Sequence, residues 1–151
     1  MAVDLLRVLS LLGSGLTAGV LFAVAVSTLP ALVAMEPGTY VYAHQLLGRY
    51  WDPLMPIIVL STTATDALLA GLGPAGVRGW YVAAAAVLLG VSGISHLCNV
   101  PLNRQVKAIR DPGRLPADWM DPRPLWRRWH LLRTTLAVAA LLVNAGAATV
   151  H

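Results

Sequence analysis

The chain has 151 residues, of which 57% are hydrophobic and 12% are charged, and its mean hydropathy is +0.67. Soluble domains carry roughly a quarter charged residues, so this composition excludes a soluble domain and predicts an integral membrane protein. The formal net charge is +4, but seven of the eleven Lys and Arg lie between Arg104 and Arg128. Such clustering is typical of membrane orientation signals, and we expect no nucleic-acid partner. A single cysteine, Cys98, excludes an internal disulfide and a paired-cysteine redox site.

Four apolar segments are long enough to cross a bilayer, which needs about 20 residues per helix. The predicted spans are residues 5–35, 53–73, 79–103 and 125–149, and a basic loop at 104–124 joins the last two. We therefore expect one all-α domain, an integral membrane four-helix bundle with an interfacial helix before the second span. The lipid bilayer is the first partner that this fold implies.

The first predicted span contains Gly15 and Gly19, a pair of small residues four positions apart. In membranes this spacing lets two helix backbones approach closely. The pair serves either packing within the bundle or a homo-oligomer. Near the end of the same span, Pro30 has no backbone N–H and leaves the carbonyl of Val26 without its helical partner.

Between the first two spans, residues 39–52 read as an amphipathic helix rich in aromatic side chains, which is typical of the membrane surface. Pro53 and Pro56 are expected to kink the chain before the second span begins. His44, Gln45 and Arg49 either face the lipid headgroups or turn inward toward a functional site.

The second span carries Asp66, and an ionisable group inside a membrane helix is a candidate functional residue. It is either a hydrogen-bonded structural carboxyl, for which Arg78 and Arg7 are candidate partners, or a functional group.

Two polar clusters end the third span and open the fourth. His96, Asn99 and Asn103 are spaced so that on an α-helix they share one face, and Trp126, His130 and Arg133 have a similar spacing. Because one loop joins these helix ends, both clusters lie on the same side of the membrane. The basic residues at 104–128 predict that this side is cytoplasmic and that both termini are outside. We expect a pocket there, in which buried Arg133 needs a partner or an anionic ligand.

Two other classes of function are compatible with these residues. His44, His96 and His130 could ligate haem, iron, copper or zinc, although they come from separate segments and form no recognised metal motif. A non-catalytic membrane subunit would instead use the basic loop to contact a soluble partner or anionic lipid.

The motifs Asn99-Val100-Pro101-Leu102-Asn103 and Trp126-x-x-Trp129-His130-x-x-Arg133 resemble those of the anthrone oxygenase-like family of small four-helix membrane proteins. The Gly-rich first helix ending in Pro30 also fits. Some members oxidise an anthrone methylene to an anthraquinone carbonyl with O₂. The resemblance implies five pocket residues: Asn99, Asn103, Trp129, His130 and Arg133.

The resulting hypothesis is a membrane-embedded oxygenase that acts on a hydrophobic aromatic or phenolic small molecule, with O₂ as co-substrate and any other cofactor left open. Such a reaction needs a base, donors for an oxyanion and an apolar pocket. The base is His130 or His96. The predicted catalytic residues are His130, Arg133, Asn99 and Asn103, and the predicted substrate-binding residues are Trp126, Trp129, Gln45 and Arg49.

Overall fold

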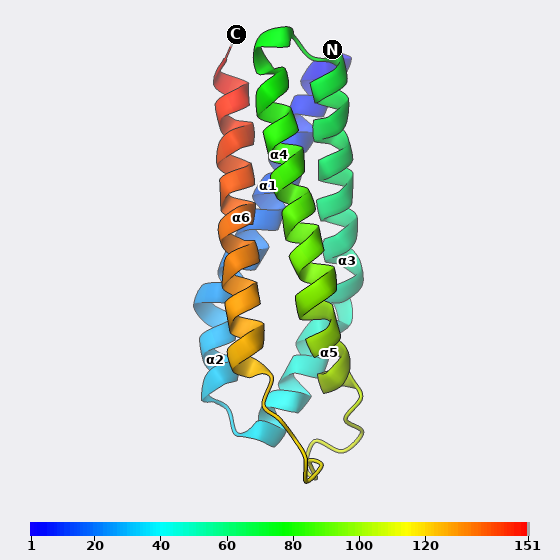
Figure 1. Ribbon diagram of the computed structural model, residues 1–151, viewed down its shortest axis with the longest axis vertical. Coiled ribbons are helices and arrows are strands. Elements are labelled where there is room, and N and C mark those ends of the chain that lie inside the picture. Colours follow the sequence, from blue (N-terminus) through cyan, green and yellow to red (C-terminus); the bar gives the residue numbers. More distant parts are fainter. Residues whose placement is uncertain (151) are drawn as a thin grey trace.

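The computed structural model describes residues 1–150, which form a bundle of four long helices without a strand in that range (Figure 1). The first long helix comprises α1 (Ala2–Ala23), a π-helical segment η1 (Val24–Thr28) and α2 (Leu29–Ala34). The second is α3 (Pro37–Leu72). The third comprises α4 (Ala75–Ile94), a π-helical segment η2 (Ser95–Asn99) and α5 (Val100–Lys107), and the fourth is α6 (Arg123–Thr149).

Each of the four long helices is long and apolar enough to cross a membrane, which confirms the predicted all-α membrane bundle. Large apolar side chains cover its outside, including Leu16, Phe22, Leu89 and Leu142, each at least 47% exposed. In a bilayer these side chains contact lipid, so the chain is a multi-pass membrane protein. Both termini lie at one end of the bundle, and the loop before α6 lies at the other (Figure 1).

The separate interfacial helix predicted at 39–52 is not present, because α3 runs unbroken through Pro53 and Pro56. Its first turns pack inside the bundle: Tyr40 and Val41 are buried in a core cluster with Leu32 and Val106. Neighbouring helices can compensate a proline in a membrane helix, since they satisfy or shield the freed backbone groups. The predicted surface segment is therefore the first part of the second spanning helix.

The first and third long helices share a local design. Each contains a five-residue π-helical segment, and each segment is followed by a proline at the second position of the next helix, Pro30 in α2 and Pro101 in α5. A proline cannot donate to the carbonyl four residues earlier, and a wider turn is one way in which a helix absorbs that lost bond. The wider turn also rotates the side chains on its two sides relative to one another.

Small residues set the spacing of the helices in the core. The central cluster draws Ala18 and Leu21 from α1, Val59 from α3, Leu88 and Val91 from α4, and Ala137 and Ala140 from α6. Gly13 faces Thr62 of α3 so closely that a methyl group there would collide with the hydroxyl. Gly15 and Gly19 have no such neighbour, so the close intramolecular approach is made at Gly13 instead.

Asp66 is fully buried in the half of the bundle nearer the termini. Ser10 Oγ donates to its Oδ1 at 2.5 Å, and Asn144 Nδ2 donates to its Oδ2 at 3.2 Å. Within residues 1–150 it makes no ion pair with Arg7 or Arg78. Asp66 is thus a hydrogen-bonded carboxyl that ties α1, α3 and α6 together.

At the opposite end, Arg123 joins the start of α6 to the end of α2. Its Nη1 donates to the backbone carbonyls of Leu32, Val33 and Met35, at 3.1, 3.2 and 2.6 Å. These are carbonyls of the last turn of α2 and the residue after it, which have no partner inside the helix. Its guanidinium also pairs with Asp121 in the loop, and this hydrogen bond lowers the pKa of the Asp121 carboxyl.

Candidate functional site

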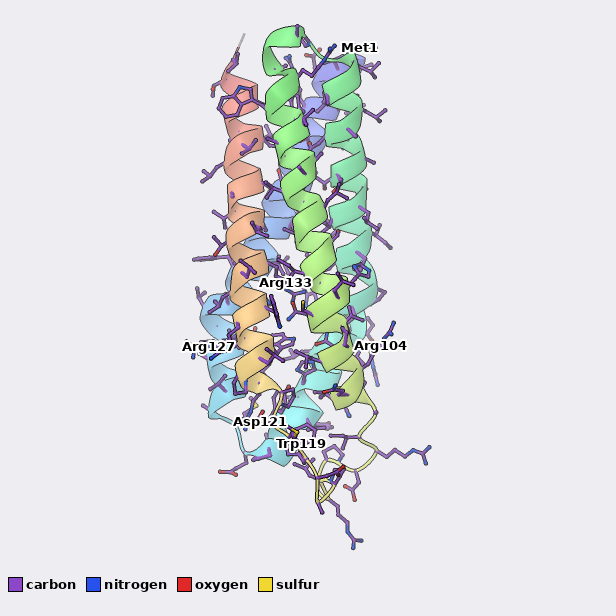
Figure 2. All side chains as sticks on the ribbon, viewed as in Figure 1. Met1, Arg104, Trp119, Asp121, Arg127 and Arg133 are labelled. Carbon is purple, nitrogen blue, oxygen red and sulfur yellow. The ribbon has the colours of Figure 1, made fainter. Side chains whose placement is uncertain are left out.

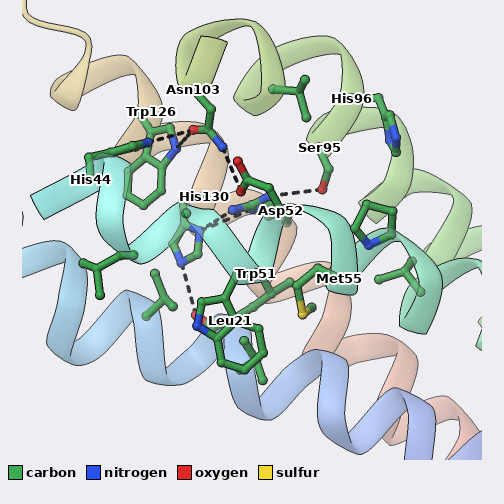
Figure 3. A pocket seen from close by; sticks show the side chains of 18 of the residues that line it. Leu21, His44, Trp51, Asp52, Met55, Ser95, His96, Asn103, Trp126 and His130 are labelled. Carbon is green, nitrogen blue, oxygen red and sulfur yellow. Dashed lines mark hydrogen bonds between the residues drawn. The ribbon is translucent and has the colours of Figure 1, made fainter. Parts of the chain in front are cut away.

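A cavity of about 420 Å³ lies inside the half of the bundle that carries the basic loop. Apolar side chains form one wall, among them Val20, Leu21, Val24, Met55, Val59 and Val91. Side chains from α3, α5 and α6 form the polar wall: His44, Asp52, Asn103, Lys107, His130 and Arg133. Figure 3 shows how His44, Asp52, Asn103 and His130 lie in it. All four long helices contribute, so the cavity exists only in the assembled bundle.

Asn103 is the centre of the polar wall. Its Oδ1 accepts hydrogen bonds from Trp126 Nε1 at 2.9 Å and from His44 Nε2 at 3.2 Å, and its Nδ2 donates to Asp52 Oδ1 at 3.4 Å. The indole N–H can only donate and a carboxylate only accepts. These two partners fix which end of the Asn103 amide carries the oxygen.

Four rings follow one another along this wall. Tyr40 and His44 meet edge to face with centroids 5.4 Å apart, and His44 meets Trp126 in the same way at 5.6 Å. Trp126 and His130 are stacked, with centroids 5.0 Å apart and an angle of 8° between the planes. Aromatic pairs in these geometries contribute about 0.5–1.5 kcal/mol beyond the area that they bury, so they favour the observed orientations of the two imidazoles.

Arg133 reaches into the cavity from α6. Its Nε and Nη2 donate to Nδ1 of His130 at 3.2 and 3.0 Å, and its Nη1 donates to Ser95 Oγ at 3.2 Å. On the other side of the imidazole, Nε2 of His130 donates to the Leu21 carbonyl at 3.1 Å. Figure 2 shows Arg133 between the helices, whereas Arg104 and Arg127 point outward near the loop end.

The charges around the cavity do not balance. Arg104, Lys107 and Arg133 line it, although Arg104 points outward, and Asp52 is its only carboxylate within residues 1–150. Asp52 is paired with Lys107, whose Nζ lies 2.5 Å from Oδ2. Arg133 has no carboxylate oxygen within 4.0 Å among the described residues, so an excess of positive charge faces the cavity.

Several predicted site residues lie outside the cavity. Asn99 is fully buried behind the wall, where its Nδ2 donates to the Trp126 carbonyl at 3.4 Å. Gln45 Nε2 donates to the backbone carbonyl of Val106, in the last turn of α5, and to that of Ile109, just after α5 ends. Arg49 is exposed, and Trp129 packs against the cluster of Leu29, Leu102 and Trp126.

His96 is exposed, and its Nδ1 donates to the carbonyl of Ser92, 3.0 Å away, on its own helix. Figure 3 places it on the opposite side of the cavity from His44. The predicted common face of His96, Asn99 and Asn103 is present only in part: His96 and Asn103 line the cavity, whereas Asn99, within the wider turn of η2, is fully buried outside its lining. Among residues 1–150 no three His, Cys, Asp or Glu side chains come close enough to hold a metal ion, so the three predicted histidine ligands are not brought together.

Several residues of the cavity were not predicted as site residues, among them Asp52, Trp51 and Ser95. Asp52 and Trp51 lie on the segment interpreted as a surface helix, and their place at the cavity depends on the continuity of α3. Ser95 is an ordinary hydroxyl residue in sequence; it is the first residue of η2, and its Oγ accepts a hydrogen bond from Arg133. The predicted common side of Trp126, His130 and Arg133 is present, since these residues contact one another in series.

Comparison with known proteins places the chain at the level of a family. The family model described as anthrone oxygenase matches residues 43–143, about two-thirds of the sequence. The chain belongs to the anthrone oxygenase family. No curated protein and no solved structure matches it. The matched range of this anthrone oxygenase family member includes every residue of the polar wall, from His44 to Arg133.

Proposed function

We propose that this protein oxidises a phenolic aromatic molecule of the anthrone type with O₂ inside the cavity. The observation that carries the proposal is the position of Arg133. This permanently charged side chain lies within a spanning helix and lines a largely apolar cavity. It has no carboxylate partner within 4.0 Å among residues 1–150. A charge in such a place is costly unless something neutralises it. An anionic ligand would do so.

The guanidinium has donors to spare for that ligand. Arginine carries five N–H groups, and the hydrogen bonds to His130 and Ser95 use three of them. One N–H on each terminal nitrogen remains, which is the pair that binds an oxyanion in a two-point contact. We assign Arg133 to the oxygen of the substrate.

Anthrone chemistry suits such a site. The methylene lies between two aromatic rings, opposite a ring carbonyl, so its deprotonation moves the negative charge onto the carbonyl oxygen. Donors aimed at that oxygen stabilise the enolate. The enolate then gives electrons to O₂; overall R₂CH₂ and O₂ become R₂C=O and H₂O, the carbon losing four electrons and O₂ gaining four.

The remaining walls fit a flat apolar molecule. A volume of about 420 Å³ lies within the usual range of roughly 300–1,000 Å³ for small-molecule sites. Trp51 and Leu47 line the cavity and are also 43% and 47% exposed on the outside of α3. A substrate dissolved in the bilayer would meet these two side chains first. We further propose that the basic loop and this end of the bundle face the cytoplasm, because cytoplasmic loops are enriched in Lys and Arg.

The test is oxygen consumption by the purified protein in detergent with 1,8-dihydroxyanthrone, corrected for spontaneous oxidation in empty micelles. We expect one O₂ consumed for each anthraquinone formed. Arg133→Gln should lower kcat/KM about 10- to 100-fold, the size expected for a lost hydrogen bond to a charged group. Arg49→Gln is the matched control, since Arg49 is exposed and lies outside the cavity. Equal activity of the two variants would contradict the proposal.

A further inference from the structure

The two buried histidines of the cavity make different hydrogen bonds. We infer that His130 is a positioning residue that holds Arg133, and that His44 accepts the proton from the substrate. This inference rests on the proposed function. It departs from the sequence-based hypothesis, in which the base is His130 or His96.

The partners of His130 determine where its proton is. The Leu21 carbonyl can only accept, so the hydrogen lies on Nε2. The Arg133 guanidinium can only donate, so Nδ1 must present its lone pair. His130 is thus a neutral imidazole with both nitrogens engaged, and it is 0% exposed.

This arrangement is unsuited to a base. A proton that arrived at Nδ1 would displace both hydrogen bonds from Arg133 and place a second positive charge against the guanidinium. The same arrangement is well suited to positioning. The imidazole bridges the Leu21 carbonyl on α1 and the arginine on α6, and it is clamped on one face by Trp126.

His44 has the complementary pattern. The Asn103 oxygen that it contacts can only accept, so the His44 hydrogen lies on Nε2. Its Nδ1 therefore carries a free lone pair, and this atom is buried without a partner among residues 1–150. His44 lines the cavity and is 5% exposed. Of the two buried histidines, His44 is the one with an unused basic nitrogen, because both nitrogens of His130 are engaged. His96 also keeps a free Nε2, since its Nδ1 donates to Ser92, but this side chain is exposed.

The proton transfer can be written out. A C–H bond of the substrate methylene breaks, its electron pair enters the ring system as an enolate whose oxygen lies on Arg133, and the proton goes to Nδ1 of His44. The resulting imidazolium keeps its Nε2–H bond to Asn103. O₂ takes up electrons from the enolate carbon and forms a C–O bond to it, and the imidazolium protonates the resulting peroxide. Loss of water, which breaks the O–O bond and the second C–H bond, then leaves the carbonyl.

One substitution made at both positions tests the inference. In His130→Gln the amide N–H can donate to Leu21 and the amide oxygen can accept from Arg133, so both bonds survive. In His44→Gln the amide N–H can still donate to Asn103, but no basic nitrogen remains. The readout is exchange of the methylene hydrogens of 1,8-dihydroxyanthrone in D₂O without oxygen, followed by mass spectrometry and corrected for exchange in empty micelles.

We expect His130→Gln to exchange within about fivefold of the unmodified protein and His130→Leu to lose most of its activity. His44→Gln should slow exchange by about 10²-fold or more, the usual contribution of a positioned base. An equal loss in His130→Gln and His130→Leu would overturn the positioning role. Undiminished exchange in His44→Gln would overturn the base role.

A second measurement uses only the unmodified protein, so it depends neither on turnover nor on whether a variant folds. The ¹⁵N shifts of labelled histidine in the unmodified protein should show His130 and His44 both neutral with the proton on Nε2. A proton on Nδ1 of either residue would overturn the inference. Failure of the proposed function would look different, because the unmodified protein would then neither oxidise nor exchange the anthrone.

Discussion

Trp126 and His130 lie one helical turn apart on α6 with their rings stacked, 5.0 Å between centroids and 8° from parallel. The contact places His130 between a rigid aromatic face and the guanidinium of Arg133. One helix therefore supplies a preassembled series of indole, imidazole and guanidinium to the cavity. Catalytic groups held by their neighbours in this way need little rearrangement when a ligand binds.

Acid should loosen the loop that carries Asp121. Because Arg123 lowers the pKa of Asp121 in the folded chain, the pair stabilises the fold above the ordinary carboxyl pKa of about 3.9 and loses this effect as the pH falls through the lower folded value. We expect the melting temperature in detergent to fall more between pH 6 and pH 3 in the unmodified protein than in Asp121→Asn. Identical acid dependence of the two proteins would contradict this.

Replacing Asp66 should reduce stability and leave catalysis nearly intact. Asp66→Leu removes the acceptor of Ser10 and Asn144 and strands the buried Asn144 amide, which costs about 1–3 kcal/mol. Asp66 does not line the cavity. Thermal unfolding should show a clear decrease in melting temperature, while oxygen consumption per folded protein stays within about twofold. A selective loss of turnover without destabilisation would show that Asp66 has another role.

The glycines of α1 should respond differently to a methyl group. Alanine is the better helix former by about 1 kcal/mol, so Gly15→Ala, with open space around the added atom, should raise stability or leave it unchanged. Gly13→Ala should lower it, because the methyl group meets the Thr62 hydroxyl. Comparison of the two melting temperatures checks this packing, and the same loss at both positions would point to a second contact surface at Gly15.

Membrane orientation can be read from two exposed positions at opposite ends of the bundle. In a Cys98→Ala background, we expect Ala75→Cys to react with a membrane-impermeant maleimide in intact bacterial cells. Ala117→Cys, in the basic loop, should react only after the cells are permeabilised. The reverse labelling pattern would show that the basic loop faces outward.

The fold class and the common side of Trp126, His130 and Arg133 could be predicted because both follow from hydrophobic length and α-helical spacing. The helix boundary predicted at Pro53 and Pro56 was wrong, because tertiary packing decides whether a helix continues through a proline. Pro53 and Pro56 looked like the end of a surface helix, but α3 continues through them, and its first turns pack against α2 and α5. Local sequence carries no record of those contacts.

The same limit explains the mixed outcome for the predicted site residues. His96 and Asn99 were assigned by α-helical periodicity, yet in the π-helical segment η2 His96 is exposed and Asn99 is buried outside the cavity lining. Asp52 and Ser95 come together at the cavity only when the four long helices are assembled around it, which the local sequence does not show. Periodicity predicts which residues share a face of a regular α-helix, and it fails where the helix changes to π-helical geometry.

The most direct test of the central claim is the charge state of a bound anthrone. Under anaerobic conditions, 1,8-dihydroxyanthrone added to the unmodified protein should show the red-shifted absorption of its enolate, at a pH where the free compound stays neutral. The shift should be absent in Arg133→Gln and retained in Arg49→Gln. Binding of the neutral form alone by the unmodified protein, or an equal shift in Arg133→Gln, would contradict the assignment of Arg133 as the oxyanion site.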